Sequence, residues 1–239
     1  MRFDPKNRAI LKRKARHLQN IAPEDDLKLS DLVVTHVIGQ GAFGRVFLGT
    51  YLRTGEKFAI KNIRKDRLVQ HRETINTVNI EYQVLFESNH PFLCSMDYYF
   101  SSEERLYFVM PFISGGEMHQ ILKSRDKFPE AEVKFYIAQV VLAVAVLHSN
   151  FIMHRDLKPA NLMLDSDGYL KVIDFGLATV LRYGLLAYES CGTPAYMAPE
   201  ILQKRGYEFS ADWWAVGIMM YEMQFGYTPF HNKRKAFQD

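Results

Sequence analysis

The spacing of hydrophobic and polar residues predicts that the two halves of this chain are built differently. Between residues 31 and 113, four short segments are rich in β-branched and aromatic residues and are separated by turn-forming residues, which is typical of strands. They are LVVTHVIG (32–39), RVFLGTYL (45–52), KFAIKNI (57–63) and RLYFVMPFI (105–113). One segment, RETINTVNIEYQVLFES (72–88), instead repeats its apolar residues at helical spacing. We therefore predict a β-rich first half with one main helix.

The second half is predicted to be mostly helical. Residues 117–150 favour helix, most strongly over PEAEVKFYIAQVVLAVAVLHS (129–149). Two short strands, LMLD (162–165) and LKVID (170–174), are predicted next, and then an apolar helix at ADWWAVGIMMYEM (211–223). The apolar run that ends at His148 is interrupted by Gln139, so we interpret it as a core helix and predict no transmembrane segment.

Composition narrows the class of protein. Of 239 residues, 48% are hydrophobic and 24% are charged, which is typical of a soluble globular protein. The net charge of +3 is too small to require a nucleic-acid partner. Cys94 and Cys191 lie far apart without metal-binding spacing, which indicates reduced thiols in an intracellular, cytoplasmic protein.

Residues 1–30 form a basic N-terminal extension. Leu11, Ala15 and Leu18 define a weak helical face among its positive charges. A solvated helix lying on the main domain is one interpretation, and docking to an anionic partner or membrane surface is the other. The positive residues are Arg2, Lys6, Arg8, Lys12, Arg13, Lys14 and Arg16.

A glycine-rich segment suggests phosphate binding. GQGAFGRV (39–46) has Gly39, Gly41 and Gly44 in the order G-x-G-x-x-G. A dinucleotide-binding fingerprint would be followed by a helix, whereas here a strand follows. A glycine-rich hairpin can lie over a triphosphate, because the missing Cβ atoms let backbone N–H groups approach closely.

Charged residues elsewhere fit the same chemistry. Lys61, taken alone, is typical of a solvated strand-edge lysine, but Glu81 on the predicted helix offers it a carboxylate partner. Such a pair can hold an ammonium group against phosphate oxygens. Asp174, after an apolar strand, and Asn161 provide oxygen ligands of the kind that Mg²⁺ prefers.

Residues 152–164, IMHRDLKPANLML, place several polar residues between apolar flanks. Buried polar groups are costly unless they are paired, so this concentration points to function. The polar residues are His154, Arg155, Asp156, Lys158 and Asn161.

Together these motifs resemble the signature set of the protein kinases. GQGAFGRV, FAIK, HRDLKPAN, DFG and APE occur in the family's order, and the resemblance covers residues 31–230. HPFL, GGEM, CGTP, APEIL and DWWAVGIMMYEM make the chain similar to the AGC group, nearest the cyclic-nucleotide-dependent kinases. The resemblance implies an α+β bilobal kinase fold, with an N-lobe and hinge over 31–113 and a partial C-lobe over 114–239.

The resemblance also implies roles for individual residues. Asp156 would accept the proton of a substrate hydroxyl, Lys158 would steady the transferred phosphoryl group, and Thr193 would contact both. Lys61 and Glu81 would form the phosphate-positioning pair, and Asn161 and Asp174 would hold Mg²⁺. Lys158 and Thr193 favour Ser/Thr over tyrosine substrates.

Further positions match the nucleotide site and the packing of the family. A stacked column, anchored by Asp212, would consist of Leu85, Met96, His154 and Phe175. The ATP-binding residues would be Gly39, Gly41, Gly44, Val46, Ala59, Lys61, Met110, Glu117 and Met163, with the hinge residues Pro111, Phe112 and Ile113.

Three departures from the family pattern stand out. Glu189 takes the place of a phosphorylated threonine, and we hypothesise that it pairs with Arg155 and orders the loop; a solvated glutamate is the alternative. Ala160 replaces a glutamate that receives a substrate arginine, while Glu117 and Glu222 keep acidic positions, so we predict a residual preference for upstream basic residues. The sequence ends at TPFHNKRKAFQD, without the family's last helices or the arginine partner of Glu200, so we expect a fragment of a longer protein.

These observations predict an ATP- and Mg²⁺-dependent Ser/Thr protein kinase that acts on protein substrates. The rival is an impaired or inactive kinase-fold scaffold, because of the shortened C-lobe. A small-molecule phosphotransferase is a weaker alternative, since CGTPAYMAPE resembles a peptide platform. A separate regulatory subunit or scaffold is compatible with the sequence, but no residue indicates one.

Overall fold

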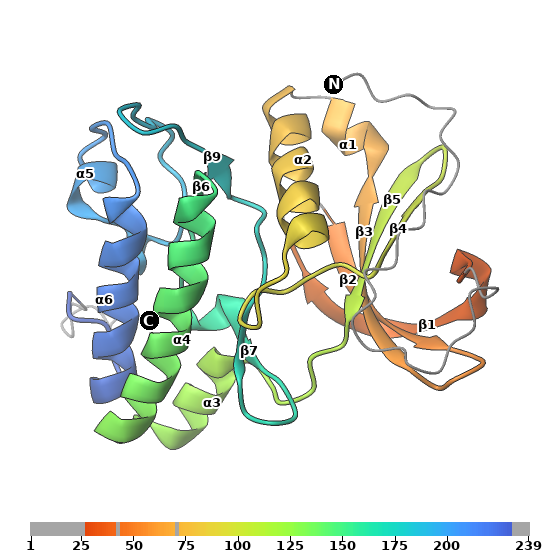
Figure 1. The fold of residues 1–239 in the computed structure, drawn as a ribbon, viewed down its shortest axis with the longest axis horizontal. Coiled ribbons are helices and arrows are strands. Elements are labelled where there is room, and N and C mark those ends of the chain that lie inside the picture. The colour runs from red at the N-terminus through yellow and green to blue at the C-terminus, as the bar shows by residue number, and fades with distance from the viewer. Residues whose placement is uncertain (1–26, 42–43, 70–71, 231–239) are drawn as a thin grey trace, which may run out of the picture. The chain divides into compact units, whose positions relative to one another are not determined.

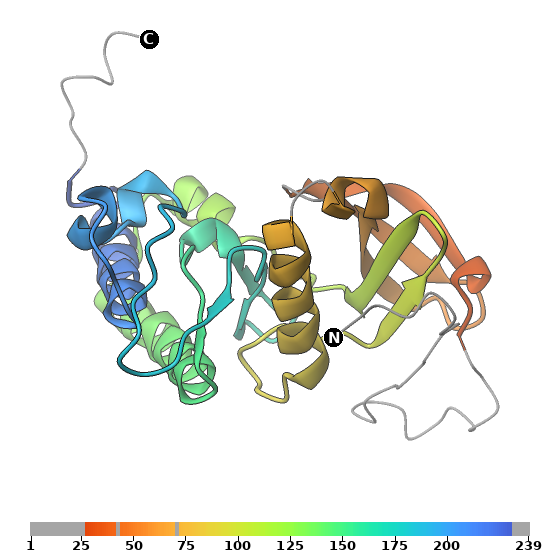
Figure 2. The same ribbon diagram turned by 90° about the horizontal axis from the view of Figure 1, so that it is seen from above.

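The computed structural model describes residues 27–41, 44–69 and 72–230, which belong to two compact units (Figures 1 and 2). The sheet unit consists of residues 27–88 and Ser95–Phe112. The helical unit consists of Asn89–Cys94 and residues 113–230. Each unit has a hydrophobic core of its own.

The sheet unit is built around a five-stranded antiparallel sheet with the order β1-β2-β3-β5-β4. All four strands predicted from the sequence are confirmed, as is the helix α2 (Arg72–Glu87). The short β4 and helix α1 (Lys65–Val69) were not predicted, because four or five residues are too few to show a period. The strands are β1 (Leu32–Gln40), β2 (Gly44–Tyr51), β3 (Lys57–Arg64), β4 (Tyr98–Ser101) and β5 (Arg105–Pro111), and the 3₁₀ turn η1 (Leu29–Asp31) precedes them.

The two faces of this sheet have different roles, because side chains alternate along each strand. Phe58 and Ile60 of β3 belong to the hydrophobic core on one face. Ala59 and Lys61 alternate with them and therefore point to the opposite face, where the ring of Tyr82 in α2 contacts Phe108. Figure 1 shows α2 beside the sheet. The remaining core residues are Leu27, Leu32, Tyr51, Tyr98, Phe100 and Val109.

The helical unit contains α4 (Glu130–Ser149) and α6 (Ser210–Phe225), which lie side by side (Figure 1). Both predicted helices are confirmed, and so are the short strands β7 (Leu162–Leu164) and β8 (Leu170–Val172). The other elements are α3 (Met118–Arg125), β6 (Ile152–Met153), η2 (Pro159–Asn161), β9 (Thr179–Val180), η3 (Pro194–Tyr196) and α5 (Pro199–Leu202).

Helix α4 is long and apolar enough, by length and composition alone, to cross a membrane. Core helices of water-soluble proteins pass the same test. Here Val140, Ala143, Val144 and Leu147 are buried, and α4 packs against α6, β6 and β8. These contacts agree with the interpretation of α4 as a core helix.

The loop between β9 and α5 covers a second group of apolar residues. Ala187 of this loop exchanges two backbone hydrogen bonds with Tyr207, at 2.8 and 2.9 Å. The core beneath consists of Met153, Leu181, Ala187, Ala198, Ile201, Tyr207, Phe209 and Ala211. The loop that carries Glu189 is therefore joined to the segment that leads into α6.

Gly44 should be the one glycine of the G-x-G-x-x-G segment that folding itself requires. A Cβ at Gly44 would lie 2.0 Å from the carbonyl oxygen of Asn62, whereas at Gly41 the nearest atom would be 3.9 Å away. We expect Gly44→Ala to destabilise the protein by about 1–3 kcal/mol, because the backbone at Asn62 would have to move away from the new Cβ. Thermal unfolding should show Tm lowered by roughly 2–4 °C per kcal/mol. Gly41→Ala is the control, and equal Tm values for the two variants would contradict this explanation.

Candidate active site

Strand register gathers the predicted phosphate-binding and adenine-binding residues of the sheet unit. Gly39 pairs with Val46, and Val46 pairs with Lys61. On the same face Ala59 pairs with Met110, while Pro111 ends β5 opposite Phe58. Residues 42 and 43, at the tip of the glycine-rich hairpin, lie outside the described residues. The sheet thus presents a lysine, small residues and glycines on the face that α2 approaches.

Lys61 and Glu81 form a buried ion pair on this face. The Nζ of Lys61 donates a hydrogen bond to the Oε1 of Glu81 in α2. Lys61 is 7% exposed and Glu81 is 1% exposed, so water screens the pair weakly. Removing one partner would leave a buried charge uncompensated, which is strongly unfavourable. The structure therefore places Lys61 in one position instead of at a solvated strand edge.

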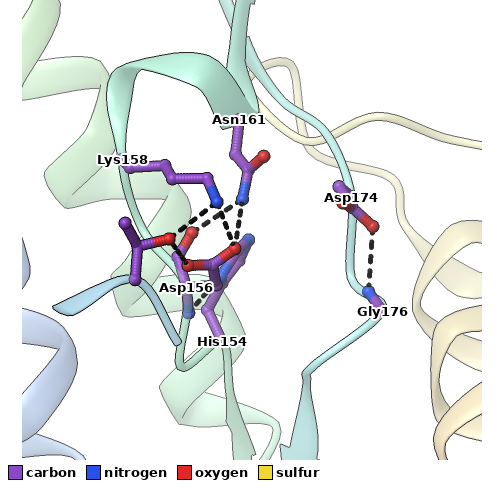
Figure 3. A network of polar contacts seen from close by, with 7 residues as sticks. His154, Asp156, Lys158, Asn161, Asp174 and Gly176 are labelled. Carbon is purple, nitrogen blue, oxygen red and sulfur yellow. Dashed lines mark hydrogen bonds and ion pairs between the residues drawn. The ribbon is translucent and has the colours of Figure 1, made fainter. Parts of the chain in front are cut away.

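In the helical unit, the carboxylate of Asp156, which follows β6, accepts hydrogen bonds from three side-chain donors (Figure 3). Its Oδ1 accepts from the hydroxyl of Thr193 at 2.7 Å. Its Oδ2 accepts from Nζ of Lys158 at 2.8 Å and from Nδ2 of Asn161 at 3.1 Å. Nζ of Lys158 also donates to the hydroxyl of Thr193 at 2.8 Å. Four residues named from the sequence are thus brought into one network.

Asn161 and Asp174 are the oxygen ligands predicted for Mg²⁺. Asn161 donates through Nδ2 to the backbone oxygen of Asp156 at 2.7 Å, so its Oδ1 is turned away from Asp156 toward the side where Asp174 lies (Figure 3). Within the described residues this Oδ1 accepts no hydrogen bond. Asp174 has a positive φ of 49° and accepts from the N–H of Gly176 at 3.1 Å. One amide and one carboxylate oxygen suit Mg²⁺, which also takes phosphate and water oxygens.

The segment 154–161, called the catalytic loop below, rests on the buried carboxylate of Asp212 in α6. Asp212 accepts backbone hydrogen bonds from His154 and Arg155, both at 2.8 Å. It also lies 2.8 Å from Nε2 of His148 in α4. A carboxylate in α6 therefore holds the two residues that precede Asp156.

His154 packs beneath Asp156 as a neutral ring. Its Nδ1 accepts from the N–H of Asp156 at 3.3 Å, and its ring lies edge-to-face with Phe175 at 5.5 Å. Complete burial lowers the pKa of His154, because the charged form would lose its hydration.

In the sheet unit, Met96 donates its N–H to the carbonyl of Leu85 at 2.8 Å. The residues of the predicted stacked column are thus buried within their own units.

The expected ion pair between Arg155 and Glu189 is present at 3.2 Å. The Arg155 side chain is 9% exposed, and its Nε donates to the carbonyl of Leu177 at 2.7 Å. Tyr207, which the sequence did not single out, donates its hydroxyl to the backbone oxygen of Glu189 at 2.6 Å. Burial raises the pKa of Tyr207 to about 12, so the hydroxyl stays protonated and remains a donor.

A glycine is required where the loop that carries Glu189 meets the catalytic loop. Gly192 has a φ of 109°, and a Cβ there would lie 2.5 Å from the carbonyl oxygen of Arg155. This close contact brings Thr193, the next residue, to the carboxylate of Asp156. The motif CGTP therefore joins two loops.

Another pair that the sequence did not predict is Tyr196 with Glu222. The hydroxyl of Tyr196 donates to Oε2 of the buried Glu222 at 2.6 Å. Burial raises the pKa of Glu222, while Tyr196 and the charge of His119 act in the opposite direction. Tyr196 lies in CGTPAYMAPE and Glu222 in DWWAVGIMMYEM, and their separation of 26 residues in the sequence hid the contact.

The remaining positions lie near the start of the helical unit. Glu117 precedes α3 and forms a β-bridge with Met163 of β7. Ile113 begins this part of the unit. Ala160 lies in η2 and brings no charge. Glu200 in α5 is half-buried, and within the described residues its carboxylate contacts no cation.

Comparison with known sequences identifies the fold. The family described as a protein kinase domain matches residues 32–239. The chain belongs to the protein kinase family. ATP and Mg²⁺ are general requirements of this family. The kinase domain accounts for the bilobal α+β architecture predicted from the motifs.

Several curated relatives are similar to this kinase domain. A RAC family serine/threonine-protein kinase homolog of Dictyostelium discoideum is 40% identical over 86% of the chain and 46% of the relative. The cAMP-dependent protein kinase type 3 of Saccharomyces cerevisiae is 40% identical over 85% of the chain and 50% of the relative. The RAC serine/threonine-protein kinase of Drosophila melanogaster is 43% identical over 82% and 32%, respectively. The chain spans half or less of the length of these relatives, and the resemblance to the AGC group is confirmed.

Asp212→Asn should loosen the catalytic loop of this kinase domain. An amide has a single acceptor oxygen, so at least one donor among His154, Arg155 and His148 would lose its partner. Each unsatisfied buried donor costs about 1–3 kcal/mol. Thermal unfolding should therefore show a lower Tm, while Glu208→Gln, an exposed site beside α6, should leave it unchanged. An Asp212→Asn variant as stable as the wild type would contradict this role.

Proposed function

We propose that this chain transfers the γ-phosphoryl group of ATP to Ser or Thr hydroxyls of protein substrates. The observation that carries the proposal is the network around Asp156, in which Thr193, Lys158 and Asn161 orient one carboxylate. A carboxylate held in this way can orient a hydroxyl and accept its proton. Such positioning is what phosphoryl transfer requires of a protein.

The residues divide the work of one displacement. The substrate oxygen forms a bond to the γ-phosphorus while the bond to the ADP oxygen breaks, and Asp156 takes the hydroxyl proton. Lys158 faces the transferred group with an ammonium that is already oriented by Asp156 and Thr193. Asn161 and Asp174 would hold Mg²⁺, which neutralises phosphate charge when bound.

Lys61 and the glycine-rich hairpin would bind the phosphates of ATP. Glu81 keeps Lys61 in place, which a phosphate-binding lysine needs. A Cβ at Gly39 or Gly41 would meet only atoms 3.6 Å or more away, so the protein itself does not require glycine there. Close approach of a phosphate to the backbone explains those two glycines better than packing does.

The rival, a non-catalytic scaffold with a kinase fold, is less well supported. A scaffold has no need for a buried ion pair between Lys61 and Glu81 or for three donors on Asp156. Such polar groups are costly to bury and contribute little net stability. The proposal extends to an intracellular, cytoplasmic location, for which the usage of cysteine in the sequence is the only support.

The direct test measures phosphate transfer from ATP and Mg²⁺ to a serine peptide with upstream arginines. Asp156→Asn should lower kcat by about 100- to 10,000-fold, because it removes the proton acceptor. Asp167→Asn, an exposed aspartate, is the matched control and should keep full activity. Absence of transfer by correctly folded wild-type protein, or equal rates for Asp156→Asn, would overturn the proposal.

Glu222 should contribute to a preference for basic peptides. Glu222→Gln should raise KM for an arginine peptide by about 10- to 100-fold, the size expected for a hydrogen bond to a charged group. The preference should grow as pH rises through the raised pKa of Glu222, since only the anion attracts arginine. Glu208→Gln is the control. Steady-state kinetics with arginine and norleucine peptides measures the effect, and equal KM values for both peptides would contradict it.

A further inference from the structure

We infer that three aromatic side chains, Phe151, Tyr183 and Phe209, clamp the loop that follows Asp174 and so make Tyr183 a positioning residue for Asp156. The name aromatic clamp is used below for these three residues. The inference rests on the proposed function for its consequence in catalysis. The clamp itself is a structural feature and is tested separately from activity.

Tyr183 contacts one aromatic ring on each of two other segments. Its ring lies 5.1 Å from that of Phe151, edge-to-face at 69°, and 5.5 Å from that of Phe209 at 55°. Phe151 follows α4, and Phe209 directly precedes α6. Edge-to-face and tilted rings at such distances attract beyond the area they bury. Tyr183 therefore ties the loop to the ends of both core helices.

Phe151 is held in an unfavourable backbone conformation at this place. Its φ of 60° lies in the left-handed region, which bulky residues rarely adopt. In this conformation its carbonyl accepts the N–H of Leu181 at 2.8 Å, while its ring meets Tyr183. Phe151 thus binds the loop through both its backbone carbonyl and its ring.

The clamp is connected to the catalytic loop by direct contacts. The ring of Phe209 lies 4.8 Å from that of His148, whose Nε2 lies 2.8 Å from Asp212. Asp212 in turn holds the backbone N–H groups of His154 and Arg155. A change in the clamp is therefore transmitted to the residues that precede Asp156.

The ion pair between Glu189 and Arg155 is sensitive to salt. The carboxylate of Glu189 is 71% exposed, and its distance to Arg155 is 3.2 Å. Because the Glu189 carboxylate is exposed to water, salt screens its attraction to the buried Arg155 guanidinium. Aromatic contacts are not screened, so the clamp should keep the loop ordered at salt concentrations that weaken the Glu189 pair.

Hydrogen exchange of residues 181–189, measured by mass spectrometry without nucleotide, tests the clamp. Tyr183→Ala should speed exchange at Leu181, Leu185 and Ala187, whose N–H groups are hydrogen-bonded in the structure, by about tenfold. Trypsin should also cut faster after the exposed Arg182. Tyr183→Phe keeps the ring and should behave as the wild type, also in 0.5 M salt, roughly three times the physiological ionic strength.

Tyr188→Ala is the matched control, because Tyr188 is 68% exposed on the same loop and has no ring contact within the described residues. Tyr183→Ala should lower kcat by about tenfold and Tm by roughly 2–4 °C per kcal/mol of lost ring contact, and Tyr183→Phe should restore both. Unchanged exchange in Tyr183→Ala, or equal exchange in Tyr188→Ala, would overturn the clamp. If hydrogen exchange became faster only in Glu189→Ala, the ion pair would be what orders the loop, and this result would also overturn the clamp. If the loop were protected from hydrogen exchange but the protein transferred no phosphate, the proposed function would be wrong and the clamp would still be supported.

Discussion

The helical unit depends on the hydrogen bonds that the buried carboxylate of Asp212 makes. It holds the backbone of His154 and Arg155 and contacts His148, so one side chain of α6 fixes the end of α4 and the start of the catalytic loop. A buried carboxylate is tolerable only with several donors, and here the donors are mostly backbone groups. The rigidity of two packed helices is thereby passed on to Asp156.

The two units position their charged groups by different means. In the sheet unit, Lys61 and Glu81 neutralise each other in a buried pair, and the strand register supplies the surrounding small residues. In the helical unit, Asp156 is oriented by neutral and charged donors on loops, with Gly192 allowing the loops to touch. The functional charges of the sheet unit thus lie on a strand and a helix, whereas those around Asp156 lie mainly on loops.

The loop between Asp174 and Thr193 is held by several contacts of different kinds. Backbone pairing of Ala187 with Tyr207, the ion pair of Glu189 with Arg155, and the rings around Tyr183 all act on it. The ion pair depends on charge, as does the hydrogen bond that Nε of Arg155 donates to the carbonyl of Leu177. A loop anchored largely by packing and backbone hydrogen bonds can be ordered without an added phosphate.

The sequence alone determined the elements with a clear period and the residues that lie in contiguous motifs. The strands around Lys61, the helices α4 and α6, and the cluster from His154 to Asn161 all follow from local patterns. Only the tertiary structure decided which distant residues touch: Tyr196 with Glu222, and Tyr183 with Phe151 and Phe209. Short elements such as β4 also escaped prediction. The physical reason is that periodicity and propensity act over a few neighbouring residues, whereas these contacts depend on how separate segments pack.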